Sequence, residues 1–228
     1  LMQGGGIRQS IIPNFTPTQY DPIILDLDGD GIETVGLNAG VLFDHNADGI
    51  KTGTGWVGKD DGLLVLDKNN NGKIDSGAEL FGDNTLLKNG QKAKDGFAAI
   101  GDLDVNQDGK LNSSDAVFSS LRVWQDVNQD GVSQAGELKT LSTLGISSIN
   151  TSASITGGQN QNNGNVIIGS SSFERLDGST NTSGALNFTG NTFTREFSDV
   201  IDTSAVSGLT DMRASGTVRD LREAAALS

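Results

Sequence analysis

Apolar residues follow two different spacings along the chain, and these predict two kinds of secondary structure. Between residues 98 and 144 the spacing is typical of one face of an α-helix. The apolar positions are Ala98, Ile100 and Leu103, then Val117, Leu121 and Trp124, and then Leu138, Leu141 and Leu144. A polar, acidic segment separates each group from the next, so the pattern predicts two helix-loop-helix units in tandem.

After Gly145 the chain is rich in Ser, Asn, Thr and Gly, and it contains short segments with high β-propensity. These segments are ISSIN, NVIIG, SSFERL and ALNFTGNTFTREF. They predict a small antiparallel sheet. The C-terminal sequence VRDLREAAALS predicts a short helix from about Val218.

The first 20 residues hold two of the three prolines and a Gly triplet, and they lack a sustained period, which is typical of a linker. We therefore expect a linker segment over residues 1–21, a folded module over 22–200 and a tail over 201–228. The chain begins at Leu1 rather than Met, which suggests a piece of a larger protein. It has no apolar run long enough to span a membrane and no signal-peptide pattern.

The formal net charge is -13, with 29 acidic against 16 basic residues. Such a chain repels a phosphate backbone, which argues against a nucleic-acid partner and favours cations. Of the 29 acids, 21 lie between Asp21 and Glu137. The absence of Cys excludes disulfides and thiolate sites, and a single histidine, His45, argues against a His-based zinc site.

The acids gather in a short motif with glycine that recurs five times. The copies are LDLDGDGIETVG (25–36), FDHNADGIKTGT (43–54), DKNNNGKIDSGAEL (67–80), DVNQDGKLNSSDAV (104–117) and DVNQDGVSQAGEL (126–138). Ca²⁺ takes six to eight oxygen ligands, and a 12-residue loop supplies them from positions 1, 3, 5, 7, 9 and 12 around a Gly at position 6. The motif therefore predicts calcium loops.

The last two copies follow this ligand pattern throughout. In one the ligands are Asp126, Asn128, Asp130, the Val132 carbonyl, Gln134 and Glu137, and in the other Asp104, Asn106, Asp108, the Lys110 carbonyl, Asn112 and Asp115. The third copy offers Asp67, Asn69, Asn71, the Lys73 carbonyl and Asp75, with Glu79 one residue late at position 13. We therefore expect an α+β fold in which a calcium-loaded, EF-hand-like helix-loop-helix pair and acidic β-turns pack with the small antiparallel sheet.

The first two copies are half-loops. They carry Asp26, Asp28 and Asp30, and Asp44, Asn46 and Asp48, but Leu37 and Gly55 stand at position 12. Either they borrow ligands such as Glu33, Asp60 or Asp61, or they are plain β-turns. Five bound Ca²⁺ ions would reduce the net charge to -3. Since only the folded chain offers these sites, metal binding would then promote folding.

The first copy also resembles the nucleophile motif of haloacid-dehalogenase-type phosphatases, because IILDLDGDG is a hydrophobic strand followed by DxDG. Three features argue against this interpretation. Asp30 stands where that family has Thr or Val, the chain lacks alternating strands and helices, and the acidic motif recurs.

The first copy directly follows the Asp21-Pro22 bond. An Asp side chain next to Pro can attack its own main-chain carbonyl to form a five-membered anhydride, and the proline nitrogen is a comparatively basic leaving group. Proximity is built in, so the remaining requirements are orientation of the carboxylate and protonation of the nitrogen.

These features together resemble the self-processing module of FrpC-type RTX proteins. The resemblance rests on DP followed by IILDLDGDGIET, on LLVLDKNNNGKIDSGAELFGDNT and on VWQDVNQDGVSQAGEL, and it extends from about Pro22 to Val200. It implies a secreted or surface-exposed bacterial protein and type I secretion. The implied activity is calcium-triggered autocatalytic cleavage of the Asp21-Pro22 bond, a single-turnover reaction that releases residues 1–21.

In that family the aspartyl anhydride is hydrolysed or captured by a lysine amine in cis or in trans, giving an Asp-Lys isopeptide cross-link. Carried over, Asp21 is the nucleophile, Pro22 is the leaving residue, and the chain is a monomer before cross-linking. The acid that protonates the nitrogen stays open among Tyr20, His45 and a carboxyl of raised pKa, although His45 is more simply a loop side chain. The alternative is a non-catalytic calcium-binding spacer or adhesin module with an inert Asp-Pro bond.

Overall fold

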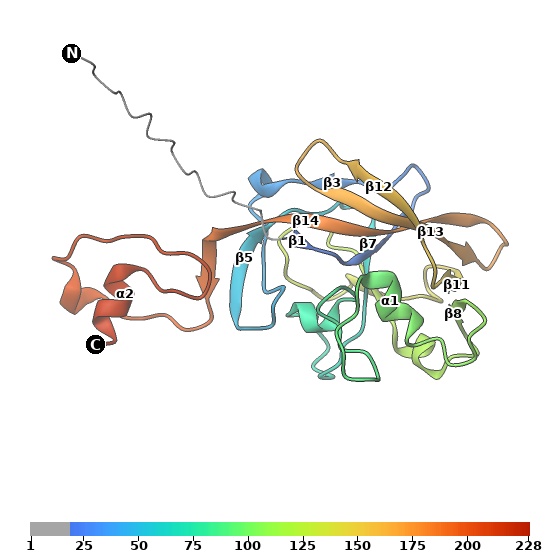
Figure 1. Ribbon diagram of the computed structural model, residues 1–228, viewed down its shortest axis with the longest axis horizontal. Coiled ribbons are helices and arrows are strands. Elements are labelled where there is room, and N and C mark those ends of the chain that lie inside the picture. Colours follow the sequence, from blue (N-terminus) through green and yellow to red (C-terminus); the bar gives the residue numbers. More distant parts are fainter. Residues whose placement is uncertain (1–18) are drawn as a thin grey trace, which may run out of the picture.

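In the computed structural model, which describes residues 19–228, the chain consists mainly of antiparallel β-strands (Figure 1). The strands are β1 (Gln19–Tyr20), β2 (Ile23–Leu25), β3 (Thr34–Val35), β4 (Leu42–Phe43), β5 (Ile50–Thr54), β6 (Trp56–Val57), β7 (Gly62–Val65), β8 (Lys110–Asn112), β9 (Arg122–Trp124), β10 (Leu138–Thr140), β11 (Ile146–Asn150), β12 (Ser154–Asn160), β13 (Val166–Arg175) and β14 (Thr180–Phe197). The helices of this part are α1 (Gly96–Gly101) and α2 (Leu221–Ala226), with 3-10 turns η1 (Leu37–Ala39), η2 (Gly77–Glu79), η3 (Ala116–Ser120) and η4 (Ser204–Val206).

Most strands belong to one sheet with the order β10-β9-β7-β2-β14-β13-β11-β8. The long strand β14 also pairs with β1 and β5, while β12 pairs with β13 and β4 with β5. Figure 1 shows β14 running through the middle of the molecule. Because β1 and β2 both pair with β14, the chain on either side of the Asp21-Pro22 bond is fixed to the same strand.

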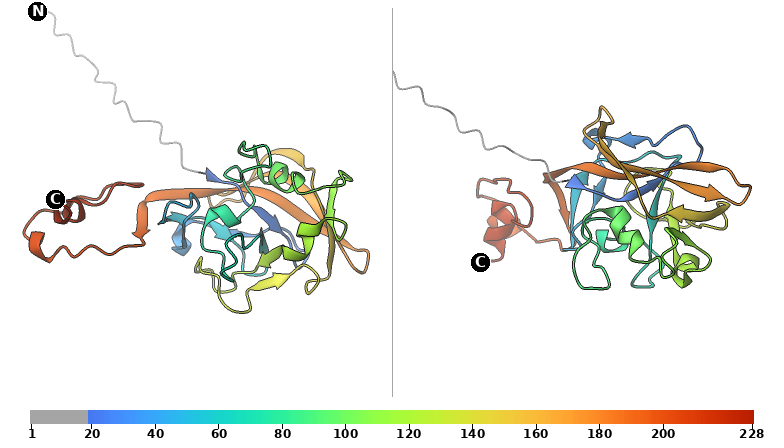
Figure 2. Two further views of the ribbon diagram at one scale, coloured as in Figure 1. Left: turned by 90° about the horizontal axis from the view of Figure 1, so that it is seen from below. Right: turned by 45° about the vertical axis from the view of Figure 1, so that its right-hand side comes forward.

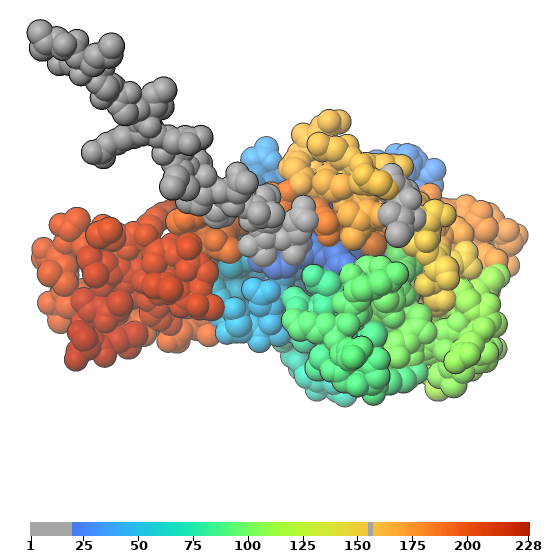
Figure 3. All heavy atoms as spheres, in the orientation of Figure 1, coloured from blue at the N-terminus to red at the C-terminus, as the bar shows by residue number. Residues whose placement is uncertain are grey.

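The sheet is buried on both faces. Side chains alternate between the faces along a strand, so Ile23 and Leu25 of β2 enter one core cluster and Ile24 enters the other. Phe97 and Ile100 of α1 cover the first face. In Figure 3 the segment around α1, coloured green, lies against the blue N-terminal strands. The Asp21-Pro22 bond thus immediately precedes a strand that lies deep in the molecule.

The expected α+β fold with an EF-hand-like helix pair is wrong. Helix α1 precedes the loop that starts at Asp104, but η3 and β9 follow it, and the loop that starts at Asp126 joins strands β9 and β10. The apolar residues near Trp124 do not share one helical face, because Val123 packs in the first core cluster and Trp124 in the second. A period of two, not 3.6, describes this segment.

The segments after Gly145 do form antiparallel strands, β11 to β14, but they belong to the large sheet and not to a small separate one. The short helix expected near the C-terminus is α2. The tail forms a lobe at one end of the molecule, beside the end of β14 (Figure 2). Arg195 of β14 holds it there by donating to Asp220 Oδ1 at 2.6 Å. Residues 1–18 of the expected linker lie outside the described residues.

Candidate functional site

The Asp21-Pro22 bond lies between β1 and β2, and hydrogen bonds hold the chain on both sides of it. Tyr20 pairs with Phe188 of β14, and the Pro22 carbonyl accepts a hydrogen bond from the Leu186 main-chain N–H at 3.1 Å. A proline has no N–H to give to the sheet, so Pro22 fits at the entrance to β2. The bond is therefore held in a fixed place rather than in a free loop.

The Asp21 side chain points into a cavity of about 20 Å³, which is room for about one water molecule. The side chain is buried, and its Oδ1 accepts a hydrogen bond from the Asp83 main-chain N–H at 2.5 Å. Gly82 packs so closely that a Cβ atom there would lie 2.6 Å from the same oxygen. Close packing by Gly82 and Asp83 thus fixes the carboxyl orientation.

Burial raises the pKa of Asp21 to about 7. The hydrogen bond from the Asp83 main chain opposes this rise, while the Asp83 carboxyl adds to it through its charge and a side-chain hydrogen bond. The Asp21 carboxyl is consequently divided between its neutral and ionised forms near neutral pH.

Tyr20 and His45 form another wall of the same cavity. Their rings are stacked with centroids 3.8 Å apart, and both side chains are buried. Burial lowers the pKa of His45 to about 3, so its imidazole is neutral at pH 7. Its Nε2 atom lies 3.0 Å from the Thr54 hydroxyl. His45 is thus not a solvated loop side chain, although it lies within a motif copy.

Two of the acidic loops reach this cavity directly. Asp44, the first residue of the second copy, precedes His45, and its carbonyl accepts a hydrogen bond from the Gly77 N–H at 2.7 Å. The third copy ends at Glu79, and the chain then runs through Leu80 to Gly82 and Asp83, which line the cavity. Residues of these two loops and of the segment that follows them thus form part of the wall around Asp21.

The last four copies share one backbone conformation. Position 4 has a positive φ in each, at Ala47, Asn70, Gln107 and Gln129, and the Gly at position 6 does too. In each, the Asp at position 1 accepts a hydrogen bond from the N–H of that Gly at 2.8 Å. The Asp or Asn at position 5 accepts a hydrogen bond from the N–H at position 7; in the fifth copy, for example, the Val132 N–H donates to Asp130. These bonds hold the side chains at positions 1 and 5 in the same arrangement in all four copies.

Hydrogen bonds link the side chains that were expected to be ligands within the loops. Asn71 donates to Asp75, Asn106 and Asn112 donate to Asp108, Asn128 donates to Asp130 and Gln134, and Gln134 donates to Asp130. Further residues of these loops have other surroundings or partners: Asn69 accepts from the Asn71 N–H, and the Lys110 ammonium donates to Glu174. The Asn46 and Lys73 side chains are exposed.

Two carboxylate oxygens in these loops are buried without a hydrogen-bond partner. They are Asp104 Oδ1, at position 1 of the fourth copy, and Glu79 Oε1, at position 13 of the third. A buried carboxylate oxygen without a partner is costly. A hard cation bound in each loop would satisfy its unpartnered oxygen, and the surrounding carboxylate, amide and carbonyl oxygens are the ligands that such a cation binds. The residues present therefore fit a calcium ion.

The fifth copy is joined to the second core cluster. Asp126 is buried, burial raises its pKa, and its Oδ2 accepts a hydrogen bond from Trp56 Nε1 at 2.7 Å. Glu137 at position 12 accepts bonds from the Gln134 N–H and from Trp124 Nε1. Trp56 packs edge-on against His45, with centroids 6.0 Å apart. The fifth loop thus contacts the same aromatic cluster as the Asp21 cavity.

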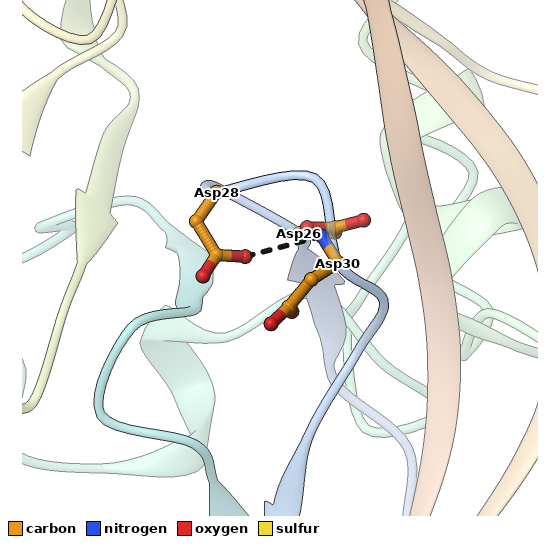
Figure 4. A group of neighbouring side chains, drawn as sticks. All are labelled: Asp26, Asp28 and Asp30. Atoms are coloured by element: carbon orange, nitrogen blue, oxygen red, sulfur yellow. Dashed lines mark hydrogen bonds between the residues drawn. The ribbon is translucent and has the colours of Figure 1, made fainter.

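The first copy differs in its hydrogen bonds, since Asp26 Oδ1 accepts from the N–H of Gly29 at position 4, at 2.7 Å. Carboxylate oxygens of Asp26, Asp28 and Asp30 lie within 4.8 Å of one another, and those of Asp28, Glu33 and Asp61 do so as well. Figure 4 shows the three aspartates of this turn and the hydrogen bond from the Asp30 N–H to Asp28. Asp61 is fully buried, and burial raises its pKa to about 7. These acidic clusters could hold a metal ion, and Glu33 and Asp61 are the residues brought to this half-loop.

Sequence reasoning missed Gly82 and Asp83. They lie about 60 residues from Asp21 in the chain, and no motif marks them. The only available signal was their place just after the third copy. Helices in the described part of the chain are all too short or too polar to cross a membrane.

Comparison with known families agrees with this geometry. The family model of the SPM domain matches residues 23–189, which is most of the chain. The chain therefore belongs to the SPM family, the self-processing modules of RTX proteins, which confirms the resemblance seen in the sequence. It is also 51% identical over 212 residues to the iron-regulated protein FrpA of Neisseria meningitidis serogroup C. That alignment covers 92% of this chain and 19% of the relative, so the chain corresponds to one part of such a protein.

Proposed function

We propose that this module cleaves its own Asp21-Pro22 bond when calcium binds, through an aspartyl anhydride that is then hydrolysed or captured by a lysine amine. The observation that carries the proposal is the placement of Asp21. Its carboxyl is buried and oriented by the Asp83 N–H, directly beside the bond that it would attack. A carboxyl held in this way has already lost most of its rotational freedom, which accelerates an intramolecular attack.

In the first step an Asp21 carboxylate oxygen attacks the Asp21 main-chain carbonyl carbon. The carbon-nitrogen bond to Pro22 breaks, and the proline nitrogen takes up a proton. The Asp83 carboxyl is the acid that we assign to this transfer, because it lies beside the Asp21 carboxyl and forms a side-chain hydrogen bond with it. In this role Asp83 gives a proton to the leaving Pro22 nitrogen.

Tyr20 and His45 act differently in this mechanism. The Tyr20 hydroxyl lies 3.3 Å from the Thr52 hydroxyl, and the His45 imidazole is neutral. Neither group is a ready proton donor at pH 7. Their stacked rings instead keep bulk water away from the carboxyl, which protects the anhydride from early hydrolysis.

The acidic loops would provide the trigger. Bound calcium supplies positive charge that offsets the repulsion among the loop carboxylates. With that repulsion removed, Glu79 fixes the end of the third loop, and the following residues carry Gly82 and Asp83 to their places beside Asp21. Extracellular loops of this type bind calcium in the millimolar range, so cleavage would await export from a bacterial cell. Secretion by the type I route belongs to the same proposal.

The non-catalytic alternative is a calcium-stiffened module in which Asp21-Pro22 stays intact. The test is to incubate the parent chain and Asp21→Asn with EDTA and with millimolar Ca²⁺, and to read new N-termini by sequencing. The Asn side chain has the same size but cannot form the anhydride. We expect a Pro22 N-terminus in the parent with calcium only. Equal processing of the two chains would disprove the anhydride mechanism.

A further inference from the structure

The residues after Asp83 form a hairpin that brings a lysine back to the Asp21 cavity. The Ala93 N–H donates to the Thr85 carbonyl at 2.8 Å, and Leu86 pairs with Lys92 as an antiparallel bridge. The Thr85 hydroxyl accepts from the Gly82 N–H and donates to the Leu80 carbonyl, which ties the hairpin to the cavity wall. The hairpin therefore has a fixed position relative to Asp21.

The ammonium group of Lys92 donates to Asn84 Oδ1 at 2.7 Å. Asn84 lines the Asp21 cavity, and it directly follows Asp83, whose N–H bonds to the Asp21 carboxyl. The Lys92 side chain is exposed, so it can change rotamer at little cost. Through Asn84, its amine is thus joined to the wall of the cavity that holds the Asp21 carboxyl.

No other lysine has this relation to the cavity among the hydrogen bonds of residues 19–228. Lys88 bonds to the Asp102 carbonyl, Lys110 to Glu174 and Lys139 to Gln125. Lys94 lies two residues beyond Lys92, and its ammonium is 3.6 Å from the Asp95 carboxylate. Lys94 is therefore a close control in sequence: the charge of its partner Asp95 acts on Asp21, but neither Lys94 nor Asp95 lines the cavity.

The segment that ends in Asp21 would not leave at once after cleavage. Strand β1 remains paired with β14, and the Tyr20 ring remains stacked on His45 in the buried cluster. The activated Asp21 carbonyl is thereby kept near Lys92 while the cavity admits about one water molecule. A nearby amine has a high effective concentration relative to amines on other molecules.

We propose that Lys92 is an internal acceptor of the Asp21 acyl group, so that the module cross-links its own N-terminal segment to the 85–93 hairpin. This inference rests on the proposed cleavage. The deprotonated Lys92 Nζ attacks an anhydride carbonyl, the carbon-oxygen bond breaks, and the released oxygen becomes a free carboxylate. The two protons that the ammonium loses equal the two that the Pro22 nitrogen gains. The product is a branched chain with the mass of the parent.

The experiment uses the full chain at low micromolar concentration in millimolar Ca²⁺, where encounters between molecules are rare. Intact mass, gel mobility and N-terminal sequencing are followed together. The branched product has unchanged mass, altered mobility, and two N-termini, Leu1 and Pro22. Trypsin would release residues 9–21 joined through Asp21 to residues 89–94, because acylated Lys92 is no longer cut.

Two matched variants separate the outcomes. Lys92→Arg keeps the charge and can still donate to Asn84, but it removes the nucleophilic amine. We expect it to reduce the branched product by about tenfold or more, with Pro22 N-termini appearing at the parental rate and Asp21 hydrolysed. Lys94→Arg should match the parent.

Two results would overturn the assignment of Lys92 as the acceptor while leaving the proposed cleavage intact. One is branched product at the parental yield in Lys92→Arg, and the other is a parent chain in which Asp21 is only hydrolysed. A parent that never shows a Pro22 N-terminus would instead overturn the proposed function and this inference with it.

Discussion

The third and fourth acidic loops have the same local chemistry but lie in different places in the molecule. Both hold the Asp at position 1 against the Gly at position 6, and each has a buried carboxylate oxygen without a partner, in Glu79 and Asp104. The third loop leads to Gly82 and Asp83 beside Asp21. The fourth loop contains β8, which lies at the end of the main sheet and pairs with β11. One motif can therefore serve to position a reacting group or to fasten a sheet edge, depending on the segment to which it is joined.

The largest effect should come from the fifth loop. Its Asp126 bonds to Trp56, which packs against His45 in the wall of the Asp21 cavity. Asp126→Lys places a cation where a buried carboxylate bonds to Trp56 Nε1 and where a metal ligand is needed. Leaving a charge buried without its partner costs about 3–5 kcal/mol. We expect calcium-induced folding, followed by circular dichroism, and cleavage to be lost together. Cleavage at the parental rate would show that calcium binding by the fourth and fifth loops is dispensable.

The difference between the third and fourth loops is tested by neutralising the last acid of each. Glu79→Gln removes the charge that fixes the end of the third loop, and we expect the cleavage rate at saturating Ca²⁺ to fall by about 10- to 100-fold. Asp115→Asn does the same in the fourth loop and should mainly raise the calcium concentration needed for folding. Rates are read from single-turnover gels. Equal loss of the maximal rate in both variants would mean that the loops have no separate roles.

Asp83→Asn tests the acid assigned to the cavity. The variant keeps the main-chain N–H but removes the carboxyl, so we expect a rate loss of about 10- to 100-fold. Because the nucleophile is the ionised carboxyl, the parental rate should rise with pH through the Asp21 pKa of about 7. Burial is the main cause of that raised pKa, and the Asp83 charge adds to it.

Removing the Asp83 charge lowers the Asp21 pKa, so the rising limb of the pH profile should move to lower pH. The profile is measured with Ca²⁺ between about pH 5 and pH 9. A limb that stays at the parental pH would contradict the effect of the Asp83 charge on the Asp21 pKa.

The smallest effect should come from deleting residues 201–228. The tail packs at the end of β14 through Arg195 and Asp220, and none of its residues lines the Asp21 cavity. Cleavage should proceed within about twofold of the parental rate, since changes remote from a site have small effects. A truncated chain that folds with calcium but fails to cleave would show that the tail belongs to the reacting module.

The loops could be predicted from the sequence because their chemistry is local. An Asp at position 1 and a Gly at position 6 determine the turn through bonds within a few residues. The strands that flank the fifth loop could not be predicted, and helices were expected there instead. Val123 and Trp124 take their conformation from strand β7, about 60 residues earlier in the chain. Short apolar runs leave helix and strand ambiguous, and pairing with a distant strand decides between them.

The same limit applies to the site. Asp21 and Pro22 are neighbours with known chemistry, so their reaction can be inferred from the sequence. Asp83 comes to Asp21 only through folding, and nothing in its own sequence context indicates a role. His45 could be named but not placed, because its burial against Tyr20 depends on strand β14.

The most direct test of the proposed self-cleavage is denaturing electrophoresis with intact-mass analysis of the purified chain, first in EDTA and then in millimolar Ca²⁺. We expect an intact chain in EDTA. With calcium we expect a Pro22 N-terminus, together with a free or cross-linked segment that ends in Asp21. A chain that gains ordered structure with calcium and keeps the Asp21-Pro22 bond would contradict self-cleavage, and would make the module a calcium-dependent structural unit.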